Sequence, residues 1–209
     1  MMTTILLVRH CEADHHVNGL TGGWTDTHLT ERGKRQAEAV ASRIAALWSG
    51  EPFSLYTSDL HRAKETADAI ANRCKVKAIS TIALREMNNG KAAGLTEKEA
   101  HRIANQTTDH DLLDWRHYPG SETWREFNRR VEEFLDEIEN CQNNRMVIVA
   151  HRGTLINVVI WWLAYRLDEH KKLPVSLTAA PGSMSLLSCN KWGEKTIEYM
   201  NDFSHIRGL

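Results

Sequence analysis

The sequence lacks the cysteine patterns that mark disulfide frameworks and metal sites. Its four cysteines are widely separated, with no C-x-x-C pair and no spacing typical of structural zinc, at Cys11, Cys74, Cys141 and Cys189. None is followed six residues later by an arginine, so the nucleophile motif of the cysteine-based phosphatases is also missing. Scattered cysteines are typical of proteins that keep their thiols reduced, and we therefore expect a cytoplasmic protein.

Long apolar runs and targeting segments are missing as well. The most apolar segment, residues 155–164, has about half the length needed to cross a bilayer, and it contains Asn157. The first residues lack the basic region, the apolar stretch and the cleavage site of a signal peptide. Neither G-x-x-x-x-G-K-[ST] nor G-x-S-x-G occurs, which excludes a P-loop and the nucleophile elbow of serine hydrolases. We expect no membrane partner.

The chain also has no excess of charge of one sign. Its 26 Lys and Arg residues nearly balance 27 Asp and Glu, and no long run of like charges occurs. Nucleic acid is therefore not expected as a partner, and an anionic ligand would need a local basic pocket. With 209 residues, 42% of them hydrophobic, the sequence is long enough for one globular domain with a sizeable core, which we place at residues 1–209.

Short apolar runs alternate with helical patterns along the chain. Strands are predicted at residues 5–8, 53–57, 76–82, 146–149, 184–188 and 196–200, with a hairpin turn at 190–193. Helices are predicted from Thr30, from Ser58 to about residue 73, from a capping box at Thr96 and Glu99, from Ser121, and over residues 155–163. This order predicts a single-domain α/β fold: a mainly parallel sheet with helices on both faces and an antiparallel edge.

Basic and imidazole side chains follow directly after the predicted parallel strands. Arg9 and His10 come after the first strand, Arg62 follows the second, His151 follows the strand at 146–149, and Glu86 comes after the third. Because the carboxyl ends of parallel strands meet at one edge of the sheet, we expect these side chains to form one site.

This set of residue types suits phosphoryl transfer. Guanidinium groups offer paired donors that match phosphate oxygens, and a neutral imidazole is a nucleophile near neutral pH. A second histidine, if protonated, adds positive charge, and a carboxylic acid can protonate the leaving oxygen and then activate water. The arginines would supply the charge that a metal supplies elsewhere, so we expect neither a metal nor a cofactor.

The motifs around these residues resemble those of the histidine phosphatase superfamily, in the branch of cofactor-dependent phosphoglycerate mutases and related small-molecule phosphatases. The similar segments span nearly the whole chain and comprise Leu7–Glu12, Gly23–Ala37, Thr57–Ala67, Leu84–Gly90, Val149–Gly153 and Asn201–His205. The resemblance implies that His10 is the phosphorylated nucleophile and that Glu86 is the proton donor and acceptor. It also implies a phosphate pocket formed by Arg9, Arg62 and His151.

Several positions depart from the family pattern. Cys11 and Arg152 stand where the usual motifs have glycine, and Ala93 stands where a glutamate usually precedes the glycine. His16 stands where many relatives have a phosphate-binding asparagine, and we assign it to the phosphate pocket, although Asn18 is close by.

Metal catalysis and a thiol nucleophile are two alternatives to phosphohistidine chemistry. His15 and His16 together with His10 are a candidate metal site, and a second is the acidic series Asp109, Asp111 and Asp114. Neither group is accompanied by the other ligands that a metal centre requires. Cys11 beside His10 could be a thiol nucleophile, but without the arginine of that motif we expect it to have a packing role.

We therefore predict a phosphatase that hydrolyses a small phosphorylated metabolite through a phosphohistidine. A phosphoglycerate-type mutase is the alternative within the same chemistry, and a non-catalytic module that binds a phosphorylated ligand or a protein is the alternative from another class. By the resemblance, mutases carry a basic insertion after the acid. Here residues 90–119, where specificity is expected to lie, are short and mixed in charge and carry no recognisable motif.

Overall fold

The computed structural model describes residues 4–107, 112–139, 144–167 and 170–209. In these residues six strands form one sheet in the order β3-β2-β4-β1-β5-β6. Two members of the acidic series considered above, Asp109 and Asp111, lie outside the described residues.

The sheet has a parallel part and an antiparallel edge. The four parallel strands are β1 (Thr4–Arg9), β2 (Ser54–Ser58), β3 (Ala78–Thr81) and β4 (Arg145–Ala150). The last two strands, β5 (Met184–Cys189) and β6 (Lys195–Asp202), are antiparallel, and β5 pairs with β1. The predicted α/β class, with a mainly parallel sheet and a late antiparallel edge, is confirmed.

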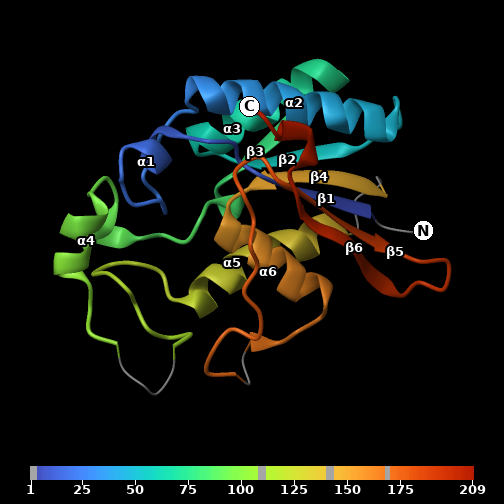
Figure 1. The fold of residues 1–209 in the computed structure, drawn as a ribbon. Helices are drawn as coiled ribbons and strands as arrows, with labels where there is room; N and C mark the ends of the chain where they lie inside the picture. Colours follow the sequence, from blue (N-terminus) through green and yellow to red (C-terminus); the bar gives the residue numbers. More distant parts are fainter. Residues whose placement is uncertain (1–3, 108–111, 140–143, 168–169) are drawn as a thin grey trace.

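Two helices cover each face of the sheet (Figure 1). On one face lie α2 (Glu31–Trp48) and α3 (His61–Cys74), and on the other α5 (Trp124–Glu139) and α6 (Arg152–Trp162). The alternation of side chains along β1 accounts for both layers, because Leu6 and Val8 belong to the core beneath α2 and α3, whereas Ile5 and Leu7 belong to the other core. Because both faces of β1 are buried, its sequence is a continuous apolar run.

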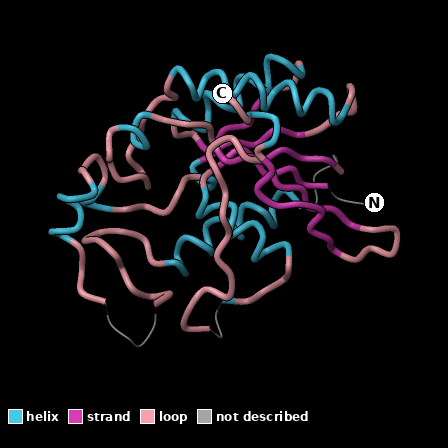
Figure 2. The backbone as a smooth tube through the Cα atoms, viewed as in Figure 1, coloured by secondary structure: helices cyan, strands magenta, loops and turns pink. Residues whose placement is uncertain are grey.

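The loops after the parallel strands gather at one end of the sheet, together with the short helices α1 (Asp14–Val17) and α4 (Glu97–Ile103) (Figures 1 and 2). Three 3-10 turns complete the described elements, at Ile82–Leu84, Gly90–Ala92 and Ser204–Ile206. Within the described parts of the chain, no helix is both long enough and apolar enough to cross a membrane.

Of the helix starts predicted at Thr30, Ser58 and Ser121, the first is confirmed and the other two are wrong. The Thr30 hydroxyl accepts the Gly33 N–H at 2.9 Å, as predicted for α2. The prediction that Ser58 caps a helix is wrong, because Ser58 is the last residue of β2 and α3 begins at His61. The start at Ser121 is also wrong, because Thr123 exchanges hydrogen bonds of 3.2 and 2.9 Å with Glu126 and α5 begins at Trp124.

Candidate active site

His10 lies directly after β1 and is only 2% exposed. Its Nδ1 atom is 2.8 Å from the Cys11 carbonyl oxygen, which can only accept, so Nδ1 carries the proton and Nε2 has the free electron pair. The Nε atom of Arg62 donates to this Nε2 at 3.3 Å. Burial, and then the positive charge of Arg62, lowers the pKa of His10 well below its usual value. The ring is therefore a neutral base with its electron pair facing a guanidinium group.

Arg62 is held in the first turn of α3 by the loop that follows α1. One terminal nitrogen donates to the Thr25 carbonyl oxygen at 2.6 Å and the other to the Gly23 carbonyl oxygen at 2.7 Å. Burial lowers the pKa of Arg62 to about 10, which leaves the group charged at neutral pH. Gly23 has a φ of +57°, and a Cβ there would lie 2.4 Å from the Asn89 side chain, so the loop that orients Arg62 requires glycine.

His16 and Arg9 meet on another side of the His10 ring. The Ala13 N–H donates to Nδ1 of His16 at 3.1 Å, so in the neutral ring the proton is on Nε2. That Nε2 lies 3.0 Å from a terminal nitrogen of Arg9, which is also a donor. Burial, and then Arg9, lowers the pKa of His16 to about 4, so this ring is neutral. Two donors this close together are best satisfied when both donate to one anionic oxygen beside them.

Arg9 has a further donor available for a ligand. One terminal nitrogen donates to the Ala179 carbonyl oxygen, while the Nε atom is buried and has no hydrogen-bond partner among the described residues. An unpaired buried donor costs free energy, which a bound anion could offset.

His151 is the N-cap residue of α6, directly after β4, and is 1% exposed. Its ring centroid is 5.0 Å from that of His10, and its Nε2 is hydrogen-bonded to the Ser58 hydroxyl at 2.9 Å. Burial, and then the charge of Arg62, lowers the pKa of His151 well below its usual value. The protonated second histidine considered from the sequence is therefore not the resting state. A bound dianion would raise this pKa again.

Glu86 follows the 3-10 turn after β3, and two backbone groups fix its carboxylate. The Met87 N–H donates to Oε1 at 2.9 Å, and the Gly153 N–H of α6 donates to Oε2 at 3.0 Å. A Cβ at Gly153 would lie 2.2 Å from Glu86 Oε1. The glycine of the fourth motif thus makes room for the acid of the third.

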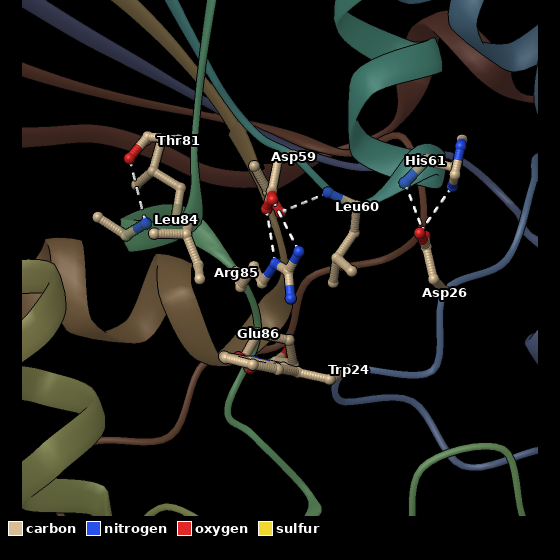
Figure 3. A network of polar contacts seen from close by, with 12 residues as sticks. Trp24, Asp26, Asp59, Leu60, His61, Thr81, Leu84, Arg85 and Glu86 are labelled. Carbon is tan, nitrogen blue, oxygen red and sulfur yellow. Dashed lines mark hydrogen bonds and ion pairs between the residues drawn. The ribbon is translucent and has the colours of Figure 1, made fainter.

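A polar network behind Glu86 holds this part of the chain against the end of β2 (Figure 3). Asp59 binds Arg85 through two hydrogen bonds of 2.7 Å, and the Arg85 guanidinium lies 4.6 Å from the centre of the Trp24 ring. Trp24 Nε1 in turn donates to the Glu86 carbonyl oxygen at 2.8 Å. Asp59, Arg85 and Trp24 were not among the predicted site residues. The only feature of the sequence that points to them is their position inside the matched motifs.

His10, His15 and His16 are the histidines of the candidate metal site identified from the sequence. Possible ligand atoms of His10, His15 and His16 lie within 4.8 Å of one another. However, His16 has its acceptor nitrogen occupied and its proton on Nε2. Burial, followed by the proximity of His16 and of the charged Arg62 and Arg9, lowers the pKa of His15 to about 3. A site with this charge and these donors fits an anion better than a cation.

Cys11 does not have the environment of a nucleophile. The residue is fully buried, and its N–H donates to the Thr66 hydroxyl at 3.1 Å. Burial raises the pKa of the Cys11 thiol to about 12, so the thiol stays protonated. Its surroundings favour the packing role expected from the sequence.

A cavity of about 530 Å³ adjoins Glu86 on the side of α4. It is lined by loop residues, by α4 and by the segment before α5, namely Thr21, Gly22, Gly23, Glu86, Met87, Asn88, Asn89, Glu97, His101, His117, Tyr118 and Ser121. The site thus combines a pocket with donors for an anion, the buried His10, and a carboxylate beside a space large enough for a small molecule.

Comparison with known proteins gives one consistent result. Residues 5–202 match the histidine phosphatase superfamily (branch 1). The chain is 28% identical, over the full length of both, to a Hydrogenobacter thermophilus protein provisionally named phosphoserine phosphatase 2. It is also 28% identical to phosphoglycerate mutase-like protein 4 of Arabidopsis thaliana, over 97% of this chain and 86% of that one.

Solved structures have the same fold. Mycobacterial glucosyl-3-phosphoglycerate phosphatase superposes with a TM-score of 0.78 at 22% identity, over 96% of this chain and 99% of the other. The α-ribazole phosphatase of Shigella flexneri gives 0.75 at 23% identity, over 96% of each chain.

Proposed function

Because the chain belongs to the histidine phosphatase superfamily, we propose that it hydrolyses phosphomonoesters of small metabolites through a phosphohistidine at His10. The observation that carries the proposal is the unprotonated Nε2 of His10, whose electron pair accepts a hydrogen bond from Nε of Arg62. A nucleophile that is neutral and already oriented needs no deprotonation before it attacks phosphorus.

In the first step, the Nε2–P bond forms and the bond from phosphorus to the leaving oxygen breaks. Glu86 in its acid form gives its proton to that oxygen, so the product leaves as an alcohol. Arg9, Arg62 and the Nε2–H of His16 donate to the phosphoryl oxygens, over which the charge of the transition state is spread. His151 gains a proton most readily while the dianion is bound, and then adds to this charge.

In the second step, a water molecule attacks phosphorus on the side that the alcohol has left. The Glu86 carboxylate takes a proton from the water, the N–P bond breaks, and the electron pair returns to His10 Nε2. Inorganic phosphate leaves and Glu86 is again the acid, so protons and charges balance over the cycle.

Water is proposed as the acceptor instead of a second substrate hydroxyl. A mutase must hold a doubly phosphorylated intermediate, and this requires a second group of cations beside the acid. None of the residues that line the cavity next to Glu86 in the described chain is a lysine or an arginine. This observation favours a phosphatase over the mutase alternative.

The partner proposed is accordingly a small phosphorylated molecule. The near-neutral charge and the scattered cysteines support the absence of a nucleic-acid partner and a cytoplasmic location, as expected from the sequence.

Brief mixing with a phosphate-labelled aryl phosphate, followed by an alkaline quench that preserves phosphohistidine, tests the proposal. Label is expected on His10, and His10→Ala should lose both label and turnover. Label on a serine or cysteine, or turnover by His10→Ala at the rate of the unmodified protein, would contradict the assignment.

A further inference from the structure

Two groups of polar residues line the cavity beside Glu86. In the first group, the side chains bond to the protein itself. Thr21 donates to the Ala92 carbonyl oxygen at 2.5 Å, and Asn89 accepts the Trp24 N–H at 2.9 Å. These groups fix the loops, and little of their bonding capacity remains for a ligand.

The second group of lining residues has polar side chains without a bonding partner in the described chain. Within the described residues, the carboxylate of Glu97, the rings of His101 and His117, and the hydroxyl of Tyr118 make no hydrogen bond or ion pair. Glu97 and His101 are four residues apart on α4, so they lie on the same face of that helix. Groups that face a cavity and are unpaired are the ones available to recognise a ligand.

The lining of the cavity has negative charge that no lysine or arginine of the described lining balances. Glu97 is exposed. Burial, followed by the proximity of His101, lowers the pKa of His117, so His117 contributes no positive charge at neutral pH. The nearest arginine in sequence is Arg116, and it is bound to Glu126 and to the Ser121 carbonyl oxygen instead of lining the cavity. Lys98 and Arg102 are exposed on α4, each one position beyond a lining residue, and do not line the cavity either.

We propose that the cavity binds a positively charged amino group on the leaving part of the substrate, with the Glu97 carboxylate as its partner, so that the preferred substrates are amino-bearing phosphomonoesters. This inference rests on the proposed phosphatase function, and it assigns Glu97 as a specificity-determining residue. An ammonium group offers three donors to a cavity whose described lining has the carboxylates of Glu86 and Glu97 and no lysine or arginine, whereas a second anion would meet repulsion there.

Three aryl phosphates test the charge preference with the chemistry held constant. The phosphate esters of tyramine, tyrosol and 4-hydroxyphenylacetate carry an ammonium, a hydroxyl and a carboxylate, respectively, on leaving phenols of similar basicity. We expect kcat/KM to fall in that order. Attraction and repulsion at an exposed carboxylate each change binding by a few-fold, so the ammonium ester should exceed the carboxylate ester about tenfold.

Glu97→Gln should bring the ammonium and carboxylate esters within about twofold of each other when both are normalised to the tyrosol ester, and Glu97→Lys should invert their order. Glu99→Gln is the matched control, because Glu99 is on the same helix but binds Thr96 and does not line the cavity. It should leave the tenfold ratio unchanged.

Binding of the same esters to His10→Ala, measured by calorimetry, tests the cavity independently of turnover. The same order of dissociation constants is expected there. Equal affinities for the three esters, a ratio that survives Glu97→Gln, or exclusion of all three by a protein that hydrolyses p-nitrophenyl phosphate would overturn the inference. Absence of turnover by the unmodified protein, with the binding order intact in His10→Ala, would count against the proposed phosphatase function alone.

Discussion

Replacement of Gly153 by alanine is expected to displace Glu86 while the fold is kept. The new Cβ would lie 2.2 Å from Glu86 Oε1 and 2.9 Å from a ring carbon of Phe127, whereas ordinary contacts begin at 3.4 Å. The carboxylate is the end of a flexible side chain, so it moves more easily than the helix. The required displacement is about 1 Å, and a shift of that size at a reacting group costs about 100-fold in rate, or about 2.7 kcal/mol of barrier.

The stability of Gly153→Ala should change little. Alanine is favoured over glycine inside a helix by about 1 kcal/mol, and overpacking costs about 1–3 kcal/mol. The net loss is therefore about 2 kcal/mol or less, which is below the usual stability of a domain. Thermal unfolding should show a folded protein with a modestly changed midpoint.

The assay compares two substrates that differ in their need for an acid. Gly153→Ala should lose about 100-fold in kcat/KM on an alkyl phosphate but far less on nitrophenyl phosphate, whose leaving group needs no proton. Glu86→Gln should show the same selectivity, and the double variant should be no worse than Glu86→Gln alone. Equal losses on both substrates, or fully additive effects in the double variant, would refute the argument that Gly153 acts through the position of Glu86.

Four further outcomes are expected. Excess chelator should leave the rate of phosphate ester hydrolysis nearly unchanged, because arginines supply the positive charge, whereas loss of activity that a divalent ion restores would refute this. Cys11→Ala should keep more than half of the activity, since the thiol is protonated and buried, and the thiol reagent iodoacetamide should not inactivate the folded protein. The pKa values of His10, His15, His16 and His151 are lowered in the folded protein, so the unfolded chain binds more protons and stability should fall as the pH drops below about 6.5. Denaturant unfolding should show a shallower fall over pH 6.5 to 4 for His16→Asn, and an unchanged slope would argue against a neutral His16. With 3-phosphoglycerate and a trace of 2,3-bisphosphoglycerate, release of phosphate should exceed isomerisation, and the reverse by orders of magnitude would support the mutase.

The sequence predicted the parts of the site that depend on strand ends. Arg9, His10, Arg62, His151 and Glu86 follow strands or strand regions whose apolar runs are easy to recognise, and parallel pairing brings such positions to one edge. The pairing of the strands brings these positions together whatever the orientation of their side chains.

Other features depend on three-dimensional neighbours that a sequence does not specify. Ser58 has the residue type of a helix cap, yet it pairs with His151, which is distant in sequence. Whether His151 is protonated depends on its burial and on the nearby arginines. The support that Asp59 gives to Arg85 depends on which side of the β2 end each side chain occupies.

The position of β1 in the sheet has a consequence for how the protein is made. Both neighbours of this strand in the sheet, β4 and β5, come much later in the chain, after α2, β2, α3, β3 and α5. An apolar strand that contains Ile5–Val8 must therefore remain unpaired while most of the chain is translated, which exposes it to misassociation and makes it a natural client for chaperones. His10, which follows this strand, gains its neighbour His151 only after β4 has been synthesised, so a nascent chain that ends before β4 has His10 without the rest of the site.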